Sequence, residues 1–306
     1  MKHPRLLGLI LAASLAPNAL ALGLAPQAVQ SRDSDGLHIT RWGASALPLW
    51  RDATHWRGVA YETQQYQQLD REVKTRSLAW VDQQVNAQTA LGYTLRLGWS
   101  EGAQRNLWTG DWSWSAAASE RLQWNVFANR DRVESLPALQ QGVHMNLVGV
   151  GADYQFHPRL TGVVAAHHTA FSDDQQRDVQ RWRLIWDAWP EQGVNLQWAL
   201  RTQRGQRNGQ PPLYFNPNRF EDSLVYLGWR RRHAGWLVQG RAGLGEQRID
   251  AQERTPARAS ELLVQSPQRD GQSLRLQWSS MQSAGGLQGA GYRWQQLQAQ
   301  WVIQLR

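Results

Sequence analysis

Cysteine is absent from the 306 residues of the chain. Disulfides, thiolate metal sites and cysteine nucleophiles are therefore excluded, but large exported domains also exist without disulfides, so the compartment stays open. After the first 21 residues there is also no run of about 18 apolar residues, the length that a membrane-spanning helix needs. A spanning β-strand needs only about 9–11 residues, so this second absence does not exclude a membrane.

Lysine is almost absent too, and one of the two lysines lies in an unusual N-terminal segment. Lys2 and Arg5 precede an apolar run and an Ala-Leu-Ala site. This pattern predicts a secretory signal peptide, residues 1–21, with cleavage before Leu22; a buried N-terminal helix is the alternative. Cleavage would remove two charges from the formal +8, which leaves +6, and Lys74 as the single lysine. The arginines are scattered rather than clustered, which argues against a nucleic-acid partner.

Tryptophan, by contrast, is abundant, with 18 Trp against 5 Phe and 7 Tyr. It recurs at alternate positions, as in Trp182, Leu184 and Trp186, and Arg181 and Arg183 lie between them. Period two with one apolar and one polar face indicates strands. Indole rings favour the headgroup level of a bilayer, so the pattern predicts a barrel that is apolar outside and wet inside. Sugar-stacking or core tryptophans in a soluble carbohydrate-binding protein are the alternative.

The alternation predicts fifteen strands. They cover residues 37–46, 56–66, 72–83, 89–100, 106–115, 121–130, 143–156, 160–171, 179–189, 194–202, 221–231, 236–247, 258–266, 272–280 and 292–305. Bacterial single-chain barrels normally have an even number, so we expect one more strand before Asp35; a wrongly divided strand among the fifteen is the alternative. The predicted fold class is all-β, an antiparallel transmembrane β-barrel of about 14–16 strands over residues 22–306. A soluble all-β domain is the alternative.

The connections are predicted to alternate in length. Residues 157–159, 190–193, 232–235 and 267–271 are short, whereas residues 172–178, 203–220 and 248–257 are longer and polar. In an outer-membrane barrel the short connections are periplasmic and the long ones face outward.

Three motifs in the central part of the chain resemble one family of barrels. They are NRDRVES at 129–135, FSDDQQR at 171–177 and YFNPNR at 214–219, and IWDAWP at 185–190 is similar as well. Together, in this order and spacing, they look like the barrel of the poly-β-1,6-N-acetyl-D-glucosamine (PNAG) export porin family. The agreement covers residues 120–245, and the strand rhythm extends it over the rest of the exported chain.

The resemblance implies a sixteen-stranded barrel in the outer membrane of a Gram-negative bacterium. Such a barrel passes a partly deacetylated, cationic polysaccharide from the periplasm to the cell surface, where it forms biofilm matrix. The implied partners are the exported polysaccharide, outer-membrane lipid and lipopolysaccharide. Family members carry N-terminal tetratricopeptide repeats that engage a periplasmic deacetylase. We expect this chain to lack them, so a separate repeat protein would supply that contact, or the barrel carries another cargo.

Four carboxylates are the candidate residues of the substrate path. With the Trp-bearing face outward, Glu62, Asp111, Asp153 and Asp187 face the lumen, where they would attract a cationic polymer. The same faces carry six arginines: Arg96, Arg181, Arg183, Arg201, Arg241 and Arg275. Arginine–carboxylate pairs that only brace the wall are therefore the alternative interpretation.

Two loops supply further candidates at the exit. Asp173 and Asp174 would line the exit, or would stabilise a turn. Tyr214 and Phe215 would stack on sugar rings, fold their loop inward as a gate, or anchor it.

The histidine pair His167 and His168, which precedes Ser172, is the candidate for an enzymatic function. Neighbouring residues on a strand point to opposite faces, so at most one of the two histidines shares a site with a given partner. No nucleophile elbow, HExxH pattern or convincing metal-ligand cluster is present. We therefore predict an exporter without catalysis, metal or cofactor. A general or oligosaccharide-selective porin and a barrel-rim hydrolase are the alternatives.

Overall fold

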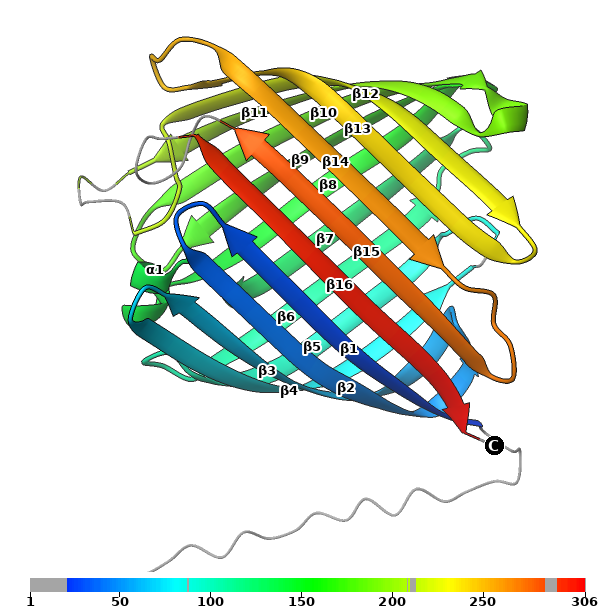
Figure 1. Ribbon diagram of the computed structural model, residues 1–306, viewed down its shortest axis with the longest axis horizontal. Helices are drawn as coiled ribbons and strands as arrows, with labels where there is room; N and C mark the ends of the chain where they lie inside the picture. The colour runs from blue at the N-terminus through cyan, green and yellow to red at the C-terminus, as the bar shows by residue number, and fades with distance from the viewer. Residues whose placement is uncertain (1–20, 87, 208, 210–212, 284–290, 306) are drawn as a thin grey trace, which may run out of the picture.

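The computed structural model describes residues 21–86, 88–207, 209, 213–283 and 291–305. They form one closed barrel of sixteen antiparallel strands, in which each strand pairs with its neighbours in sequence (Figure 1). β1 (Ala21–Asp33) pairs with β16 (Tyr292–Leu305) and so closes the barrel. The strands between them are β2 (Leu37–Asp52), β3 (His55–Gln68), β4 (Arg71–Val85), β5 (Gly92–Gly102), β6 (Leu107–Ala117), β7 (Leu122–Arg132), β8 (His144–His157), β9 (Leu160–Phe171), β10 (Gln176–Trp189), β11 (Val194–Gln206), β12 (Arg219–His233), β13 (Trp236–Ile249), β14 (Thr255–Gln265) and β15 (Gln272–Ser283).

The predicted fold class, an all-β antiparallel barrel, is confirmed, and the strand number is the upper one of the predicted range. The additional strand expected before Asp35 is β1. Its alternation is hard to detect, because Pro26 interrupts it and the outward face continues with the polar residues Gln30 and Arg32. The predicted signal peptide lies outside the described residues, except for Ala21 at the start of β1.

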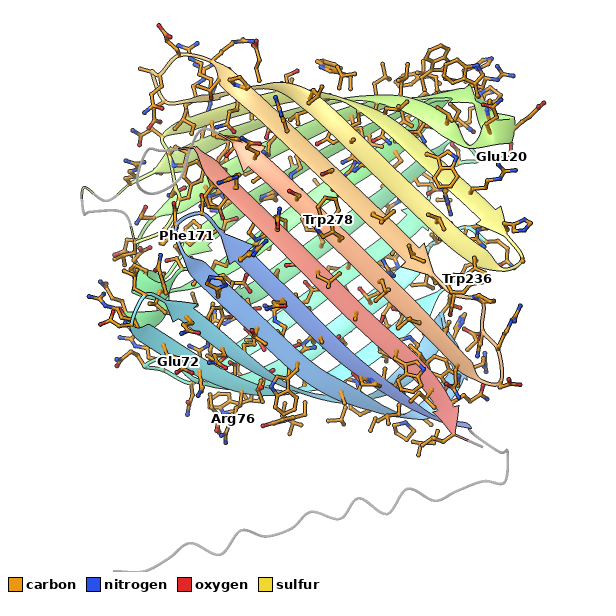
Figure 2. All side chains as sticks on the ribbon, in the orientation of Figure 1. Glu72, Arg76, Glu120, Phe171, Trp236 and Trp278 are labelled. Atoms are coloured by element: carbon orange, nitrogen blue, oxygen red, sulfur yellow. The ribbon has the colours of Figure 1, made fainter. Side chains whose placement is uncertain are left out.

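Large apolar side chains cover the outside of the barrel. Thirteen of the 18 tryptophans are exposed, among them Trp278 near the middle of the barrel wall and Trp236 towards one end (Figure 2). A soluble sandwich would bury such residues between its sheets. Apolar surface of this extent is stable against lipid rather than water. Among the described residues, no helix is both long and apolar enough to cross a membrane.

We call the end of the barrel where β1 begins and β16 ends the terminal end, and the opposite end the loop end. The long connections predicted at the loop end are shorter in the structure. β9 ends at Phe171 and β10 begins at Gln176, and Asp174 occupies the tight turn between them with a φ of 64°. Near the rim both faces of a strand are polar, so the alternation fades although the backbone hydrogen bonds continue.

One sector of the interior is apolar rather than wet. Trp50 is 3% exposed and packs with inward-facing residues of the first four strands: Ala25, Leu47, Ala60 and Val81. The expectation that tryptophan faces outward is therefore wrong at Trp50. The register between β2 and β3 shifts at residues 46–49, and this irregularity turns Trp50 to the inside.

The turn between β10 and β11 has a strict requirement for glycine. It contains the short 3₁₀ helix η1 (Pro190–Gln192), followed by Gly193 with a φ of 74°. A Cβ atom at Gly193 would lie 1.8 Å from the carbonyl oxygen of Arg230, so no other residue fits there without moving the backbone.

Candidate substrate path

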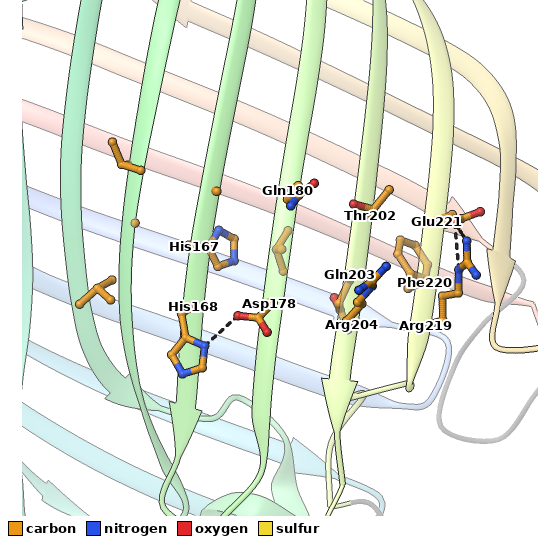
Figure 3. Close-up of a pocket in the computed structure, with 15 residues that line it drawn as sticks. His167, His168, Asp178, Gln180, Thr202, Gln203, Arg204, Arg219, Phe220 and Glu221 are labelled. Carbon is orange, nitrogen blue, oxygen red and sulfur yellow. Dashed lines mark hydrogen bonds and ion pairs between the residues drawn. The ribbon is translucent and has the colours of Figure 1, made fainter.

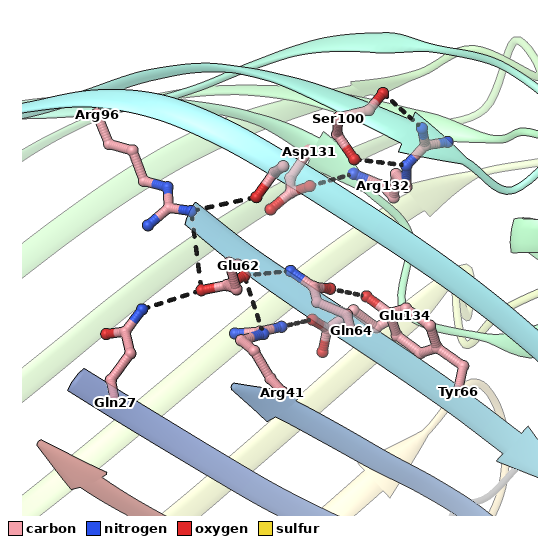
Figure 4. Close-up of polar contacts among 11 residues, drawn as sticks. Gln27, Arg41, Glu62, Gln64, Tyr66, Arg96, Ser100, Asp131, Arg132 and Glu134 are labelled. Carbon is pink, nitrogen blue, oxygen red and sulfur yellow. Dashed lines mark hydrogen bonds and ion pairs between the residues drawn. The ribbon is translucent and has the colours of Figure 1, made fainter. Parts of the chain in front are cut away.

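Glu62 lies at the centre of a polar network on the lumen wall (Figure 4). Its carboxylate lies 3.5 Å from Nε of Arg41 on β2 and 3.7 Å from Nη2 of Arg96 on β5. It also accepts a hydrogen bond of 3.0 Å from Nε2 of Gln27. The side chain is only 7% exposed, so Glu62 braces strands β1, β2, β3 and β5 more than it offers a free charge.

Three further carboxylates surround this network. Asp111 on β6 faces Arg96 across the strand pair and accepts a hydrogen bond of 3.0 Å from Nδ2 of Asn129. Asp131 ends the same wall on β7, and Glu134 contacts Arg41 at 2.5 Å from the connection that follows. Glu62, Asp111 and Asp131 border a cavity of about 680 Å³ inside the barrel. We call Glu62, Asp111, Asp131 and Glu134 the acidic wall.

Asp131 and Glu134 were not among the sequence-predicted path residues. Both belong to the NRDRVES motif at residues 129–135, which supports the family resemblance but does not by itself place either side chain in the lumen. Strand parity could not assign Glu134, because it follows the last residue of β7.

The other two predicted carboxylates lie elsewhere on the wall. Asp153 lies on β8 and Asp187 near the terminal end of β10, and the strand alternation turns both towards the lumen. Neither side chain has a hydrogen bond or ion pair to another described residue, although Asp153 is attracted by the charge of Arg183. The structure therefore brings Glu62 and Asp111 together and leaves Asp153 and Asp187 apart from them.

The opposite wall is rich in arginine. Arg201 on β11 donates from Nε to Asp222 on β12 at 2.9 Å, and Arg241 on β13 donates from Nη2 to Glu261 on β14 at 2.6 Å. These are bracing pairs of the kind that the alternative interpretation expected. The two halves of the lumen thus differ in charge, acidic along β3–β7 and arginine-rich along β10–β13.

Two segments fold over the lumen at the loop end. The first contains helix α1 (Leu136–Gln140), whose N-cap Ser135 accepts a hydrogen bond from the backbone N–H of Ala138. Leu136 and Leu139 pack on Leu37, Ile39 and Tyr66, which face inward from β2 and β3. Ser135 also donates to the carbonyl oxygen of Leu213, which joins the first segment to the second. We call residues 133–143 and 213–217 the loop-end cap.

Tyr214 anchors the second segment of the cap. It is 3% exposed, its ring centroid lies 4.6 Å from that of Phe171, and its hydroxyl donates to Oδ1 of Asp173 at 2.9 Å. Burial and the bond to Asp173 raise the pKa of Tyr214, so the phenol stays protonated at neutral pH. Asp173 and Tyr214 therefore hold the loop, and Asp174 occupies the turn.

Phe215, the next residue, is accessible. It is half-exposed at a cavity of about 550 Å³ beneath the loop-end cap, which Glu134, Arg177 and Tyr292 also line. Of the two predicted aromatics, Phe215 is thus the one that a passing sugar could contact.

The two adjacent histidines point to opposite faces of the barrel wall. His167 faces the lumen beside Phe127, and Nδ1 of His168 pairs with Asp178 at 2.8 Å on the outer face (Figure 3). Ser172 accepts a hydrogen bond from the backbone of His144 instead of bonding to either histidine. Within the described residues, no three His, Asp or Glu side chains gather to hold a metal. The described residues therefore do not assemble the catalytic site that a rim hydrolase would need.

A closed barrel with an apolar outside and a charged, partly open inside is the architecture of membrane-spanning β-barrel proteins. No protein-family model and no curated protein matches this chain. A solved structure described as a bacterial polysaccharide outer membrane secretin is similar, with 12% identity over 94% of this chain and 99% of that one and a TM-score of 0.72. At this identity the likeness shows the fold.

Two other solved barrels are similar at lower scores. They are Pseudomonas aeruginosa OccK5, with 8% identity, 94% and 98% coverage and a TM-score of 0.46, and Salmonella typhi OmpF, with 8% identity, 92% and 97% coverage and a TM-score of 0.46. These scores are too low to add to the argument.

Proposed function

We propose that this chain is an outer-membrane channel that exports a polysaccharide of the poly-N-acetylglucosamine type from the periplasm to the cell surface of a Gram-negative bacterium. The observation that carries the proposal is the acidic wall. Its Glu62 and Glu134 pair with Arg41 and Arg96, whereas Asp111 and Asp131 make no ion pair with another described residue and border a cavity that Arg130 also lines. A partly deacetylated amino-sugar polymer is cationic, and fixed carboxylates in a narrow passage raise its local concentration. The fold shared with a polysaccharide outer membrane secretin supports the same class of cargo.

The polymer would enter at the terminal end, follow the acidic wall and leave beneath the loop-end cap beside Phe215. No covalent step is part of this proposal: the chain supplies a polar path through the bilayer. A periplasmic polysaccharide deacetylase, or a separate repeat protein, would deliver the polymer to the terminal end.

The test is a clean deletion of the gene, followed by quantification of amino-sugar polymer on the cell surface and in the periplasm. We expect loss from the surface together with accumulation inside the cell, and restoration by the wild-type chain. Unchanged surface polymer would contradict the export function.

A general or oligosaccharide-selective porin is the second candidate, and the arginine-rich wall favours it because it offsets the acidic wall. Liposomes that contain the purified protein separate the two functions. With a porin, small neutral sugars enter the liposomes at a high rate. With an exporter that is closed by the loop-end cap, the same sugars enter slowly. Fast swelling combined with unchanged surface polymer in the deletion strain would favour the porin.

A further inference from the structure

Four inward-facing arginines surround a recess in the lumen wall, and a fifth, Arg258, borders it from β14 with its side chain alternating to the outer face. Arg181 and Arg183 lie on β10, Arg201 on β11 and Arg241 on β13, and together they border a cavity of about 440 Å³. Asp222 and Glu261 are the carboxylates that share it. Four positive and two negative charges leave this part of the wall positive, which is the opposite of the acidic wall. We call this cavity the arginine recess.

Two of the arginines are held rigidly. Arg201 donates to Asp222 and lies over the ring of Phe220 at 4.6 Å, and Arg241 pairs with Glu261 and lies over Tyr226 at 4.9 Å. An ion pair on one side and an aromatic face on the other fix the plane of a guanidinium group. These two arginines therefore form fixed walls of the recess.

The other two arginines are attracted by carboxylates only at longer range, Arg181 by Asp222 and Arg183 by Glu261 and Asp153. Neither Arg181 nor Arg183 makes a hydrogen bond or an ion pair with another described residue. Arg181 also lies directly opposite Arg201 in the strand pairing, and like charges in that position destabilise a sheet. A local conflict of this kind is expected where a residue serves binding rather than folding.

Small side chains line part of the recess. Ala165, Ala199, Ala257 and Ala259 face inward from β9, β11 and β14 and border it together with larger residues such as Leu224 and Met281. Arg181 is exposed and Arg183 is partly exposed, so their donors can be reached from the lumen.

We infer that the arginine recess binds an oxyanion carried by a saccharide, either a carboxylate or a phosphate. Guanidinium groups recognise both oxyanions through paired N–H donors, and two arginines without an ion pair to a described residue provide the donors here. The saccharide part of the inference rests on the proposed function, whereas the oxyanion part rests on the recess alone. Cargo with both a cationic amino sugar and an anionic group would be held between the acidic wall and the arginine recess.

The test is calorimetric titration of the purified full-length protein in detergent at low salt. Trigalacturonate probes the carboxylate, glucose 6-phosphate probes the phosphate, and maltotriose is the neutral reference. We expect at least one of the two anions to bind, more weakly as salt is added. The double substitution R181Q/R183Q should weaken that binding at least about tenfold, since hydrogen bonds to charged groups contribute on this scale.

Arg275→Gln is the matched control, because Arg275 faces the lumen from β15 outside the recess, and it should bind like the wild type. Ala199→Phe is an independent variant that adds bulk at the lining of the recess, keeps all four arginines and should also weaken binding. The inference would be overturned if neither anion bound more tightly than maltotriose, or if R181Q/R183Q bound the anion as tightly as the wild type. Binding of chitotriose, an amino-sugar trimer, tests the acidic wall separately, and Asp111→Asn should abolish it. Failure of the proposed function can therefore be distinguished from failure of the oxyanion inference.

Discussion

Glu62 and Asp153 show how two lumen carboxylates on similar strands can have different physical roles. Glu62 is buried among Arg41, Arg96 and Gln27, so its charge is already compensated. Asp153 has no such partner among the described residues and is influenced by Arg183 only at longer range. An uncompensated charge acts on a passing ion, whereas a compensated one mainly stabilises the wall.

The double substitution D153N/D187N should therefore reduce export without unfolding the barrel. Removing two unpartnered charges changes the field in the lumen, and substitutions away from packed contacts change the free energy of unfolding by less than about 0.5 kcal/mol. We expect several-fold less amino-sugar polymer on the surface at unchanged protein level. Unchanged export would remove Asp153 and Asp187 from the path.

Glu62→Gln provides the contrasting control. It leaves Arg41 and Arg96 without their shared carboxylate, although Glu134 still contacts Arg41. The loss of one partner of a buried ion pair destabilises by up to about 3–5 kcal/mol, and the remaining contact of Arg41 places the expected value towards the lower end of that range. Denaturant unfolding of barrels refolded in lipid vesicles measures the difference between the two variants.

Strand parity correctly predicts that Glu62 and Asp111 are on the inside of the wall. It could not separate a bracing carboxylate from a free one. Arg41 and Arg96 reach Glu62 from β2 and β5, and which side chain arrives there depends on barrel curvature and strand stagger rather than on the local pattern.

Helix α1 lies over the lumen at the loop end of the barrel and forms part of the loop-end cap. It has five residues, too few to be stable alone, and it persists because Leu136 and Leu139 are buried against β2 and β3. Ser135, Pro137 and the spacing of Leu136 and Leu139 are local signals for a short helix, but nothing in the sequence places that helix over the lumen. Its position over the lumen follows from tertiary packing, and the loop-end cap that it forms narrows the exit.

Leu139→Ala should loosen this cap. Leu139 is fully buried, and removal of a buried leucine side chain costs about 2–5 kcal/mol. A cost of about 2 kcal/mol raises the population of the open cap about thirtyfold. We expect faster protease cleavage within residues 133–143 and a larger, noisier single-channel current in planar bilayers.

Gln140→Ala is the matched control, since Gln140 lies in the same helix and is not part of its apolar contact. This variant should be cleaved by the protease at the wild-type rate and should give the wild-type single-channel current. Equal cleavage rates for the two variants would show that the α1 contact does not hold the cap closed.

At the scale of the whole molecule, the barrel has a largely apolar outside and a largely polar inside, and the apolar interior sector around Trp50 is an exception. Trp278 and Gln277 are neighbours on β15 that point to opposite sides of the wall. An arginine introduced at either position adds the same charge at the same depth along the barrel wall. The two variants therefore test whether the outer surface faces lipid.

Trp278→Arg should destabilise the barrel in lipid vesicles by about 2–4 kcal/mol, the cost of an arginine facing the middle of a bilayer. Gln277→Arg points into the lumen and should change the free energy of unfolding by less than about 0.5 kcal/mol. The measurement is denaturant unfolding in vesicles, monitored by tryptophan fluorescence. Equal effects of the two substitutions would contradict a lipid-facing outer surface at β15.

The sequence by itself determined the strands, their inward and outward faces and the tryptophan-rich surface, because alternation along a strand is a local property that each segment carries alone. Only the tertiary structure decided the register shift that turns Trp50 inward, the folding of α1 over the lumen, and the gathering of Arg181, Arg183, Arg201 and Arg241 around one recess. Each of these depends on strands or loops far apart in the chain meeting at a particular stagger. The curvature and closure of the barrel fix that stagger, and no local pattern encodes it.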